Sequence, residues 1–189
     1  MLFAEHKAHG LENILEDDTE EANIARLHFD PTRQLVLEQL DWGFARARFQ
    51  GVKVNTTSVG TPHLTVALQR PPNTLRVRQV TRCDHPVEFL SENVIWVADD
   101  AETLVHITRD EREISLFPPI ARTAMVYHLA HHFVLAFSRS LNRSNQMLDN
   151  FYRTMAMAEE TEALGRFNGP AYGGSTDQAA HDYVTWGYR

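Results

Sequence analysis

The sequence is poor in cysteine, in lysine and in long apolar runs. Its single cysteine, Cys83, excludes an intramolecular disulfide and is compatible with a reducing compartment. No apolar run approaches the length of a membrane span, and the N-terminus has no basic segment followed by an apolar one. We therefore expect neither a membrane-spanning helix nor a secretory signal. Internal repeats and low-complexity tracts are also absent from the sequence.

Basic residues are fewer than acidic ones. The net charge is -7, and of the 18 basic residues only Lys7 and Lys53 are lysines. An acidic chain is poorly suited to nonspecific binding of phosphate backbones, which needs clustered basic residues. Arginine favours bidentate and interface pairing. At 189 residues and 43% hydrophobic, the chain fits one domain, or one domain with an appendage, and can bury a core without metals.

Two helical patterns lie back to back in residues 117–164. The first places seven apolar residues on one broad helix face: Val126, Leu129, Ala130, Phe133, Val134, Phe137 and Leu141. The second repeats the spacing with Leu148, Phe151, Met155 and Ala158. Pro118 and Pro119 suit a helix start, and the cap-type residues at 141–144 can restart the chain after a tight turn. The patterns predict an antiparallel helical hairpin.

The N-terminal quarter also has helical patterns. Residues 2–15 favour a first helix, and the acidic residues at 16–21 suit the positive end of a second. Pro31 is expected to kink or end that second helix. The predicted aromatic core anchors are Trp42, Phe44, Phe133, Phe137 and Phe151.

From residue 50 the pattern changes from helix to strand. Residues 64–69 and 75–80 are short β-type runs, and residues 94–98 and 103–108 flank a polar interval that favours a β-hairpin. We therefore predict an α+β fold that is mainly α. It comprises a helical bundle (residues 1–49 and 117–164), a small antiparallel β insertion (50–116) and an extended C-terminal docking tail (165–189).

The C-terminal segment combines glycine with aromatic residues. Its glycines predict a tail that cannot fold alone, whereas its aromatic side chains predict docking on a partner. Extended, it can reach roughly 80 Å. The predicted docking residues are Tyr183, Trp186, Tyr188 and Arg189.

Three groups of residues invite a chemical interpretation. His128, His131 and His132 have a spacing that can place two imidazoles on one metal, but no further ligand follows in the sequence. We therefore interpret them as the polar edge of a partly buried helix or an intersubunit surface. Cys83, beside Asp84 and His85, is interpreted as a loop cysteine rather than a nucleophile.

The third group is a basic stretch, Arg70, Arg76, Arg78 and Arg82. It favours a solvated face or salt bridges to a neighbouring subunit over contact with nucleic acid. No Walker loop, dinucleotide fingerprint or nucleophile elbow is present, and the glycines at 169–174 follow no strand pattern. We therefore expect neither an enzyme nor a bound cofactor or metal.

Four features in this order resemble the head-tail adaptor proteins of tailed bacteriophages, also called connector or head completion proteins. They are the acidic segment 16–22, the FDPTR run at 29–33 leading to Trp42-Gly43-Phe44-Ala45, the QRPPNT segment between strands, and the hairpin ending in AMAE at 156–159. The resemblance covers most of residues 10–165. Within this group, the sequence is most similar to the adaptors that include tail tubular protein A of short-tailed phages and the adaptors of long-tailed phages and gene transfer agents.

The resemblance implies a homo-oligomeric ring, usually of about twelve copies, that sits beneath the portal protein and extends the DNA channel into the tail. A tail, stopper or nozzle protein would bind the other side, and genomic DNA would pass through the lumen without sequence-specific binding. Such a protein is made in the bacterial cytoplasm, becomes part of the virion at the head-tail junction and contacts no membrane. The alternative from the residues themselves is a small helical DNA-binding or regulatory protein.

Overall fold

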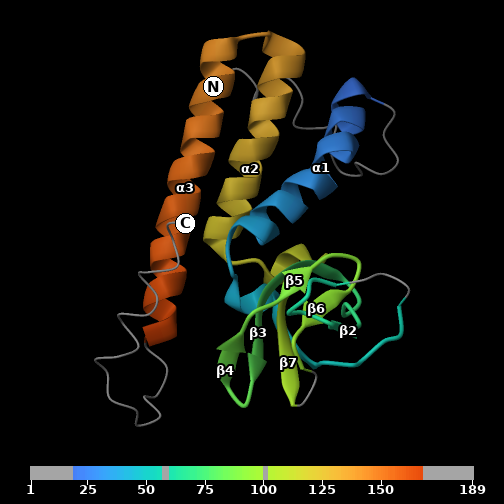
Figure 1. Cartoon of the computed structure of the whole chain (residues 1–189). Coiled ribbons are helices and arrows are strands. Elements are labelled where there is room, and N and C mark those ends of the chain that lie inside the picture. The colour runs from blue at the N-terminus through green and yellow to red at the C-terminus, as the bar shows by residue number, and fades with distance from the viewer. Residues whose placement is uncertain (1–18, 57–59, 100–101, 168–189) are drawn as a thin grey trace.

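The computed structural model describes residues 19–56, 60–99 and 102–167. The helix predicted at 2–15 lies outside these residues, as does the tail beyond residue 167. Figure 1 shows the helices at one end of the described chain and the strands at the other, with α1 running from one to the other. The helices are α1 (Glu20–Gln39), α2 (Pro119–Phe133) and α3 (Leu141–Phe167). The strands are β1 (Arg46–Gln50), β2 (Val66–Leu68), β3 (Thr74–Arg82), β4 (His85–Val87), β5 (Leu90–Ser91), β6 (Ile95–Val97) and β7 (Thr103–Arg109).

The prediction of a mainly helical bundle with a small β insertion is wrong. The structure is a sheet-rich α+β fold with two antiparallel sheets, 49% helical and 25% strand. One sheet has the strand order β1-β7-β3-β4 and the other β2-β6-β5. Residues 46–49, assigned above to the helical part, form most of β1 and pair with β7. In this segment arginines alternate with Ala47 and Phe49, which is the period of two that is typical of a β-strand. The helical pattern of the preceding residues had led to its assignment to the helical part.

The predicted hairpin between residues 94–98 and 103–108 is also wrong, because its two strands belong to different sheets. β6 pairs with β2 and β5, whereas β7 pairs with β1 and β3. The side chains explain the error: apolar residues of both sheets form one core, consisting of Leu68, Val77, Val80, Ile95, Val97, Val105 and Ile107. Alternating apolar residues show which side chains face a core. They do not show whether the partner strand lies beside them or across the core.

The sequence of β6 is apolar throughout because both of its faces are covered. Ile95 and Val97 point into the core between the sheets, while Trp96 packs on the other face with Leu64 and Ala67. All three residues of β6 are buried.

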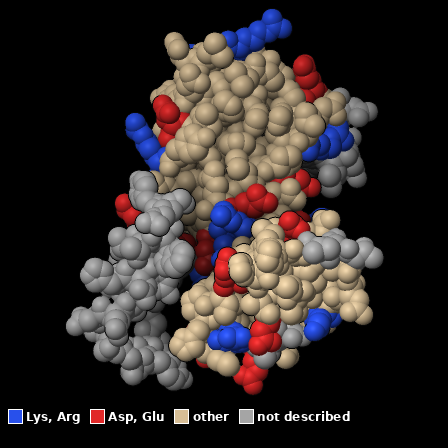
Figure 2. Space-filling model, in the orientation of Figure 1, with Lys and Arg blue, Asp and Glu red and all other residues tan. Residues whose placement is uncertain are grey.

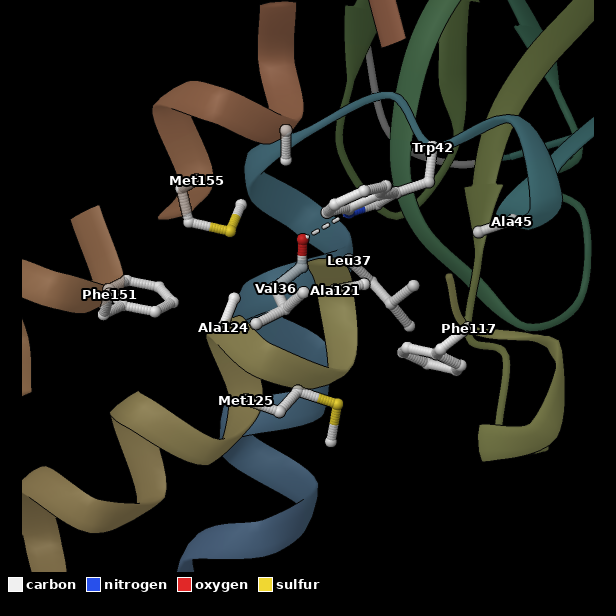
Figure 3. Close-up of a cluster of buried hydrophobic side chains, with 11 residues drawn as sticks. Val36, Leu37, Trp42, Ala45, Phe117, Ala121, Ala124, Met125, Phe151 and Met155 are labelled. Atoms are coloured by element: carbon white, nitrogen blue, oxygen red, sulfur yellow. Dashed lines mark hydrogen bonds between the residues drawn. The ribbon is translucent and has the colours of Figure 1, made fainter. Parts of the chain in front are cut away.

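The helical end has its own core, which Figure 3 shows. It gathers α1, α2, α3 and the 3-10 turn Gly43–Ala45, with Val36, Leu37, Trp42, Ala45, Phe117, Ala121, Ala124, Met125, Phe151, Met155 and Ala158 buried. Trp42 is fully buried and donates its indole N–H to the Val36 carbonyl at 2.7 Å. The indole nitrogen, which is buried together with the ring, therefore has a hydrogen-bond acceptor.

Pro31 was expected to kink or end its helix; α1 continues through it, so the second alternative is wrong. Thr19 caps its start, because the threonine hydroxyl accepts a hydrogen bond from the Ala22 amide at 3.2 Å. Pro31 has no amide to offer the Leu27 carbonyl, so one hydrogen bond of the helix is missing at its middle.

The helical hairpin predicted from residues 117–164 is present as α2 and α3, which lie antiparallel in Figure 1. Between them lies a π-helical turn, Val134–Ser138, and then Arg139 in the left-handed conformation with φ 49°. The second helix begins at Leu141 and runs past the predicted boundary at residue 164 to Phe167.

Candidate functional site

The outside of the hairpin carries large apolar side chains that no described residue covers. Five of them lie on α2, the π-helical turn and α3, and we call this set of residues the hairpin face: Val126 (62% exposed), Leu135, Leu141 (68%), Tyr152 (56%) and Met157 (61%). Beside Val126 the surface has a hollow of about 410 Å³ lined by residues of α2 alone. Exposed apolar residues of this size mark interaction surfaces when they occur together.

This part of the chain also has very few charges. From residue 123 to residue 148, Arg139 and Arg143 are the charged residues, histidines aside. Figure 2 shows a broad uncharged surface over the helical end of the molecule, with charged side chains at its margins. Depletion of charge is typical of the core of protein interfaces.

Four imidazoles meet where α1 crosses the hairpin. This histidine cluster consists of His28 from α1 and His128, His131 and His132 from α2. His28 and His132 stack face to face, with ring centroids 3.9 Å apart and planes 9° from parallel. His132 also meets His128 and His131 edge-on, at 4.9 Å and 5.1 Å.

The two remaining rings are held by hydrogen bonds. Thr32 Oγ1 of α1 lies 2.8 Å from His128 Nδ1. His131 Nδ1 lies 2.7 Å from Ser144 Oγ and 3.1 Å from the Ser144 carbonyl oxygen, both on α3. The cluster therefore joins all three helices.

The packing lowers the basicity of the cluster. Burial, and after it the neighbouring His28, His128 and His131, lower the pKa of His132 to about 4. Burial also lowers the pKa of His128, with smaller contributions from His131 and His28. At neutral pH His132 and His128 are therefore uncharged and can stack and pack like other aromatic side chains.

These histidines were interpreted as the polar edge of a partly buried helix or an intersubunit surface, and the structure adds that they pack against α1 within the subunit. They are half-buried and lie beneath α1. No group of three His, Cys, Asp or Glu in the described residues is placed to hold a metal ion. His28 was missed from the sequence, although Ala25, His28 and Thr32 share the spacing of one helix face.

The arginines of the basic stretch form hydrogen bonds within the chain, although Arg76 and Arg82 are also exposed to solvent. Arg78 of β3 donates to the carbonyls of Leu37, Glu38 and Leu40 at the end of α1, at 3.1, 2.8 and 2.5 Å. Arg76 reaches the Glu38 carbonyl as well, at 3.3 Å. Since the last turn of α1 contains no basic residue, these arginines supply the positive charge that a helix C-terminus favours.

The other two arginines of the stretch also have partners within the chain. Arg70 donates to the carbonyls of Glu92, Thr74 and Leu75, and Arg82 forms an ion pair with Asp99 at 3.1 Å. A nucleic-acid surface built on these four side chains would have to break those contacts.

Cys83 lies in the turn between β3 and β4, where Cys83 and Asp84 both have positive φ, 48° and 64°. Its thiol donates to Glu102 Oε2 at 3.2 Å. That hydrogen bond and the charge of Glu102 raise the thiol pKa. The geometry therefore stabilises the thiol, whereas a nucleophile needs the thiolate.

The structure places the predicted core anchors in two regions. Trp42 and Phe151 are buried in the helical core, and Phe44 packs against its edge. Phe133 and Phe137 lie outside that core, half-buried with their rings 6.0 Å apart; Phe133 ends α2 and Phe137 lies in the π-helical turn. The predicted docking residues Tyr183, Trp186, Tyr188 and Arg189 lie outside the described residues.

Within the part of the chain that the structure describes, none of the helices is both long enough and apolar enough to span a membrane. The sequence matches no protein-family model and no curated protein.

Proposed function

We propose that this protein is a structural, non-enzymatic virion protein that assembles into a homo-oligomeric ring at the head-tail junction of a bacteriophage. The ring would bind the portal protein on one side and a tail, stopper or nozzle protein on the other. The observation that carries the proposal is the hairpin face, five exposed apolar side chains of which three lie in the charge-poor stretch 123–148. The family resemblance of the sequence supplies the partners.

Leaving the hairpin face exposed to water costs free energy. Val126, Leu141 and Met157 are each more than 60% exposed, so covering them with a second copy removes apolar surface from water. A contact between different surfaces of two copies repeats from copy to copy and gives a ring when the rotation between copies closes. The hollow beside Val126 offers a place for a side chain of the next copy.

The internal arginine contacts support the same function. Arg78 joins β3 to the end of α1, and Arg33 of α1 pairs with Asp110 beyond β7, so sheets and helices are tied together by hydrogen bonds as well as by packing. A ring that transmits load between head and tail needs subunits that keep their shape.

The test is to co-express the full chain with the portal protein encoded in the same genome and to analyse the complex by native mass spectrometry and cryo-electron microscopy. We expect a closed ring of this protein on the portal. Val126→Glu should abolish the ring, because a carboxylate would be buried in the contact. Val52→Glu is the matched control, since Val52 is 55% exposed but lies away from the hairpin.

A second variant tests the C-terminal docking residues. Removal of residues 168–189 should leave a folded protein, by circular dichroism, that no longer joins the portal. A genome without a portal gene near this one, or no complex with the intact chain, would overturn the proposal. Normal assembly of Val126→Glu would refute the hairpin face, and salt-sensitive binding of duplex DNA by the isolated chain would favour the DNA-binding alternative.

A further inference from the structure

We propose that the histidine cluster is an acid-sensitive latch, which holds residues 20–30 of α1 against the helical hairpin while the rings are neutral and releases them on protonation. The inference concerns a conformational response of the subunit itself. It does not depend on which partners the protein binds.

The stacked pair is the centre of the latch. His28 of α1 and His132 of α2 lie face to face at 3.9 Å, a distance at which two neutral aromatic rings pack favourably. Two imidazolium ions at the same distance repel each other, and each would also lose part of its hydration. Protonation therefore converts the contact that joins α1 to the hairpin into a repulsive one.

Among the described residues, no acidic side chain contributes to the pKa of His132. Facing the stack are His28 from α1, His128 and His131 from α2, and on α3 the uncharged side chains of Ser144 and Phe151. Among the described residues, the charged groups that influence the pKa of His132 are the three other histidines, and each of them lowers it. A carboxylate at this place would have stabilised the protonated form instead.

The two halves of α1 are held by different means. Beyond Pro31, Arg33 is buried and paired with Asp110, Val36 and Leu37 lie in the helical core, and the helix end is bound by Arg78. Before Pro31, His28 stacks on His132 of α2, and Ala22 and Ala25 are buried. Pro31 itself leaves the Leu27 carbonyl without its helical hydrogen bond, so the helix lacks one hydrogen bond at the boundary between the halves.

The pH range follows from the pKa of His132, which is about 4 with the latch closed and about 6.5 for a free histidine. The open form takes up a proton at a pH where the closed form does not, so lowering the pH from 6.5 toward 4 favours opening. At pH 5 these two values shift the equilibrium by up to about 30-fold, less where solvent screens the ring.

The test measures amide hydrogen exchange of the full chain by mass spectrometry at pH 7.5 and pH 5, corrected for the intrinsic pH dependence of exchange. We expect protection of peptides within residues 20–30 to fall by about tenfold or more at pH 5, while residues 33–39 keep theirs. Equal protection of residues 20–30 at both pH values would overturn the proposal.

Variants separate protonation from packing. His28→Phe and His132→Phe keep a flat ring that cannot be protonated, so the double variant should keep residues 20–30 protected at pH 5. His85→Gln changes an exposed histidine of β4 and should respond to acid like the unaltered chain. Folding of each variant is checked by circular dichroism at pH 7.5. If the double variant misfolds, the same comparison is made with His132→Gln, which removes the charge from the stack. If residues 20–30 of the variant lost as much protection at pH 5 as those of the unaltered chain, the proposal would be overturned.

Discussion

Arg33 of α1 and Asp110, 77 residues apart in the sequence, form an ion pair with 2.5 Å between Nη1 and Oδ1. The arginine side chain is 1% exposed and also donates to the Glu111 carbonyl, at 2.6 Å. Burial by itself would lower the pKa of Arg33, but the hydrogen bonds and negative charges of Asp110 and Asp30 together outweigh it, and the pKa is raised. The pair fastens α1 to the end of the sheet that contains β7.

Removing Asp110 should therefore be costly. Asp110→Ala leaves a buried guanidinium with only the exposed Asp30 as a carboxylate partner, and we expect the free energy of unfolding to fall by about 3 kcal/mol. Arg112→Ala is the control, because Arg112 also faces Asp110, at 3.8 Å, but is 80% exposed. Its loss should cost less than about 1 kcal/mol in the same urea titrations. Equal midpoints for Asp110→Ala and the unaltered chain would contradict this role.

Arg78 provides a second measurable anchor. Arg78→Lys keeps the charge but cannot reach three carbonyls and the Thr108 hydroxyl at once, so we expect a loss of about 1–2 kcal/mol in unfolding free energy. Arg76→Lys removes a single exposed hydrogen bond and should lie within about 0.5 kcal/mol of the unaltered chain. A stability of Arg78→Lys equal to that of Arg76→Lys would show that the geometry of the guanidinium is unimportant.

Two glycines make a matched pair for a backbone prediction. A Cβ on Gly60 would lie 2.0 Å from the Leu64 carbonyl oxygen and 2.7 Å from the Trp96 ring, so Gly60→Ala must displace backbone or a buried indole. We expect a loss of about 2 kcal/mol or more in thermal or urea unfolding. At Gly43 the nearest atom would be a Glu162 carboxylate oxygen at 3.6 Å, and Gly43→Ala should be nearly neutral. The opposite order of stabilities would contradict the close packing of Gly60 against Leu64 and Trp96.

Exposure of Cys83 should not make it reactive. Because Glu102 raises the thiol pKa through a hydrogen bond and its charge, alkylation by iodoacetamide at pH 7.5 should be slower than for a free cysteine. Glu102→Asn removes the charge and shortens the side chain, and asparagine tolerates the positive φ of 49° found there. The alkylation rate should then rise several-fold. An unchanged alkylation rate would show that Glu102 does not control the reactivity of the Cys83 thiol.

The stability of the whole chain should decrease in mild acid. The pKa of His132 is lowered from about 6.5 unfolded to about 4 folded, so the unfolded chain binds more protons in this interval. Its contribution is therefore complete above pH 6.5 and is lost as the pH falls toward 4. His128 and His106, whose pKa values burial also lowers, act in the same direction.

For His132 we expect a loss of about 1–2 kcal/mol between pH 7.5 and 5, after allowing for solvent screening of a half-buried ring. Urea unfolding at the two pH values measures it. His132→Phe should show a smaller dependence on pH, and an identical dependence would assign the effect to other groups.

Several elements could be recognised from the sequence because their signals are local. The apolar spacing in residues 117–164 predicted the hairpin of α2 and α3, and the short β-type runs correspond to β2, β3, β6 and β7. Trp42 was recognised as a core residue since a large ring beside a helical pattern needs burial. Helix and strand periodicities are properties of neighbouring residues, so they are visible without a fold.

Tertiary structure alone decided which strands pair and what the polar side chains do. β6 and β7 follow one another in the chain but face each other across a core, which alternation by itself does not distinguish from a hairpin. Arg78 became a cap for a helix about forty residues away because the sheet packs beneath the end of α1. His28 met His132 because α1 crosses the hairpin. These contacts join residues far apart in sequence, and their energies depend on burial and distance that no local pattern encodes.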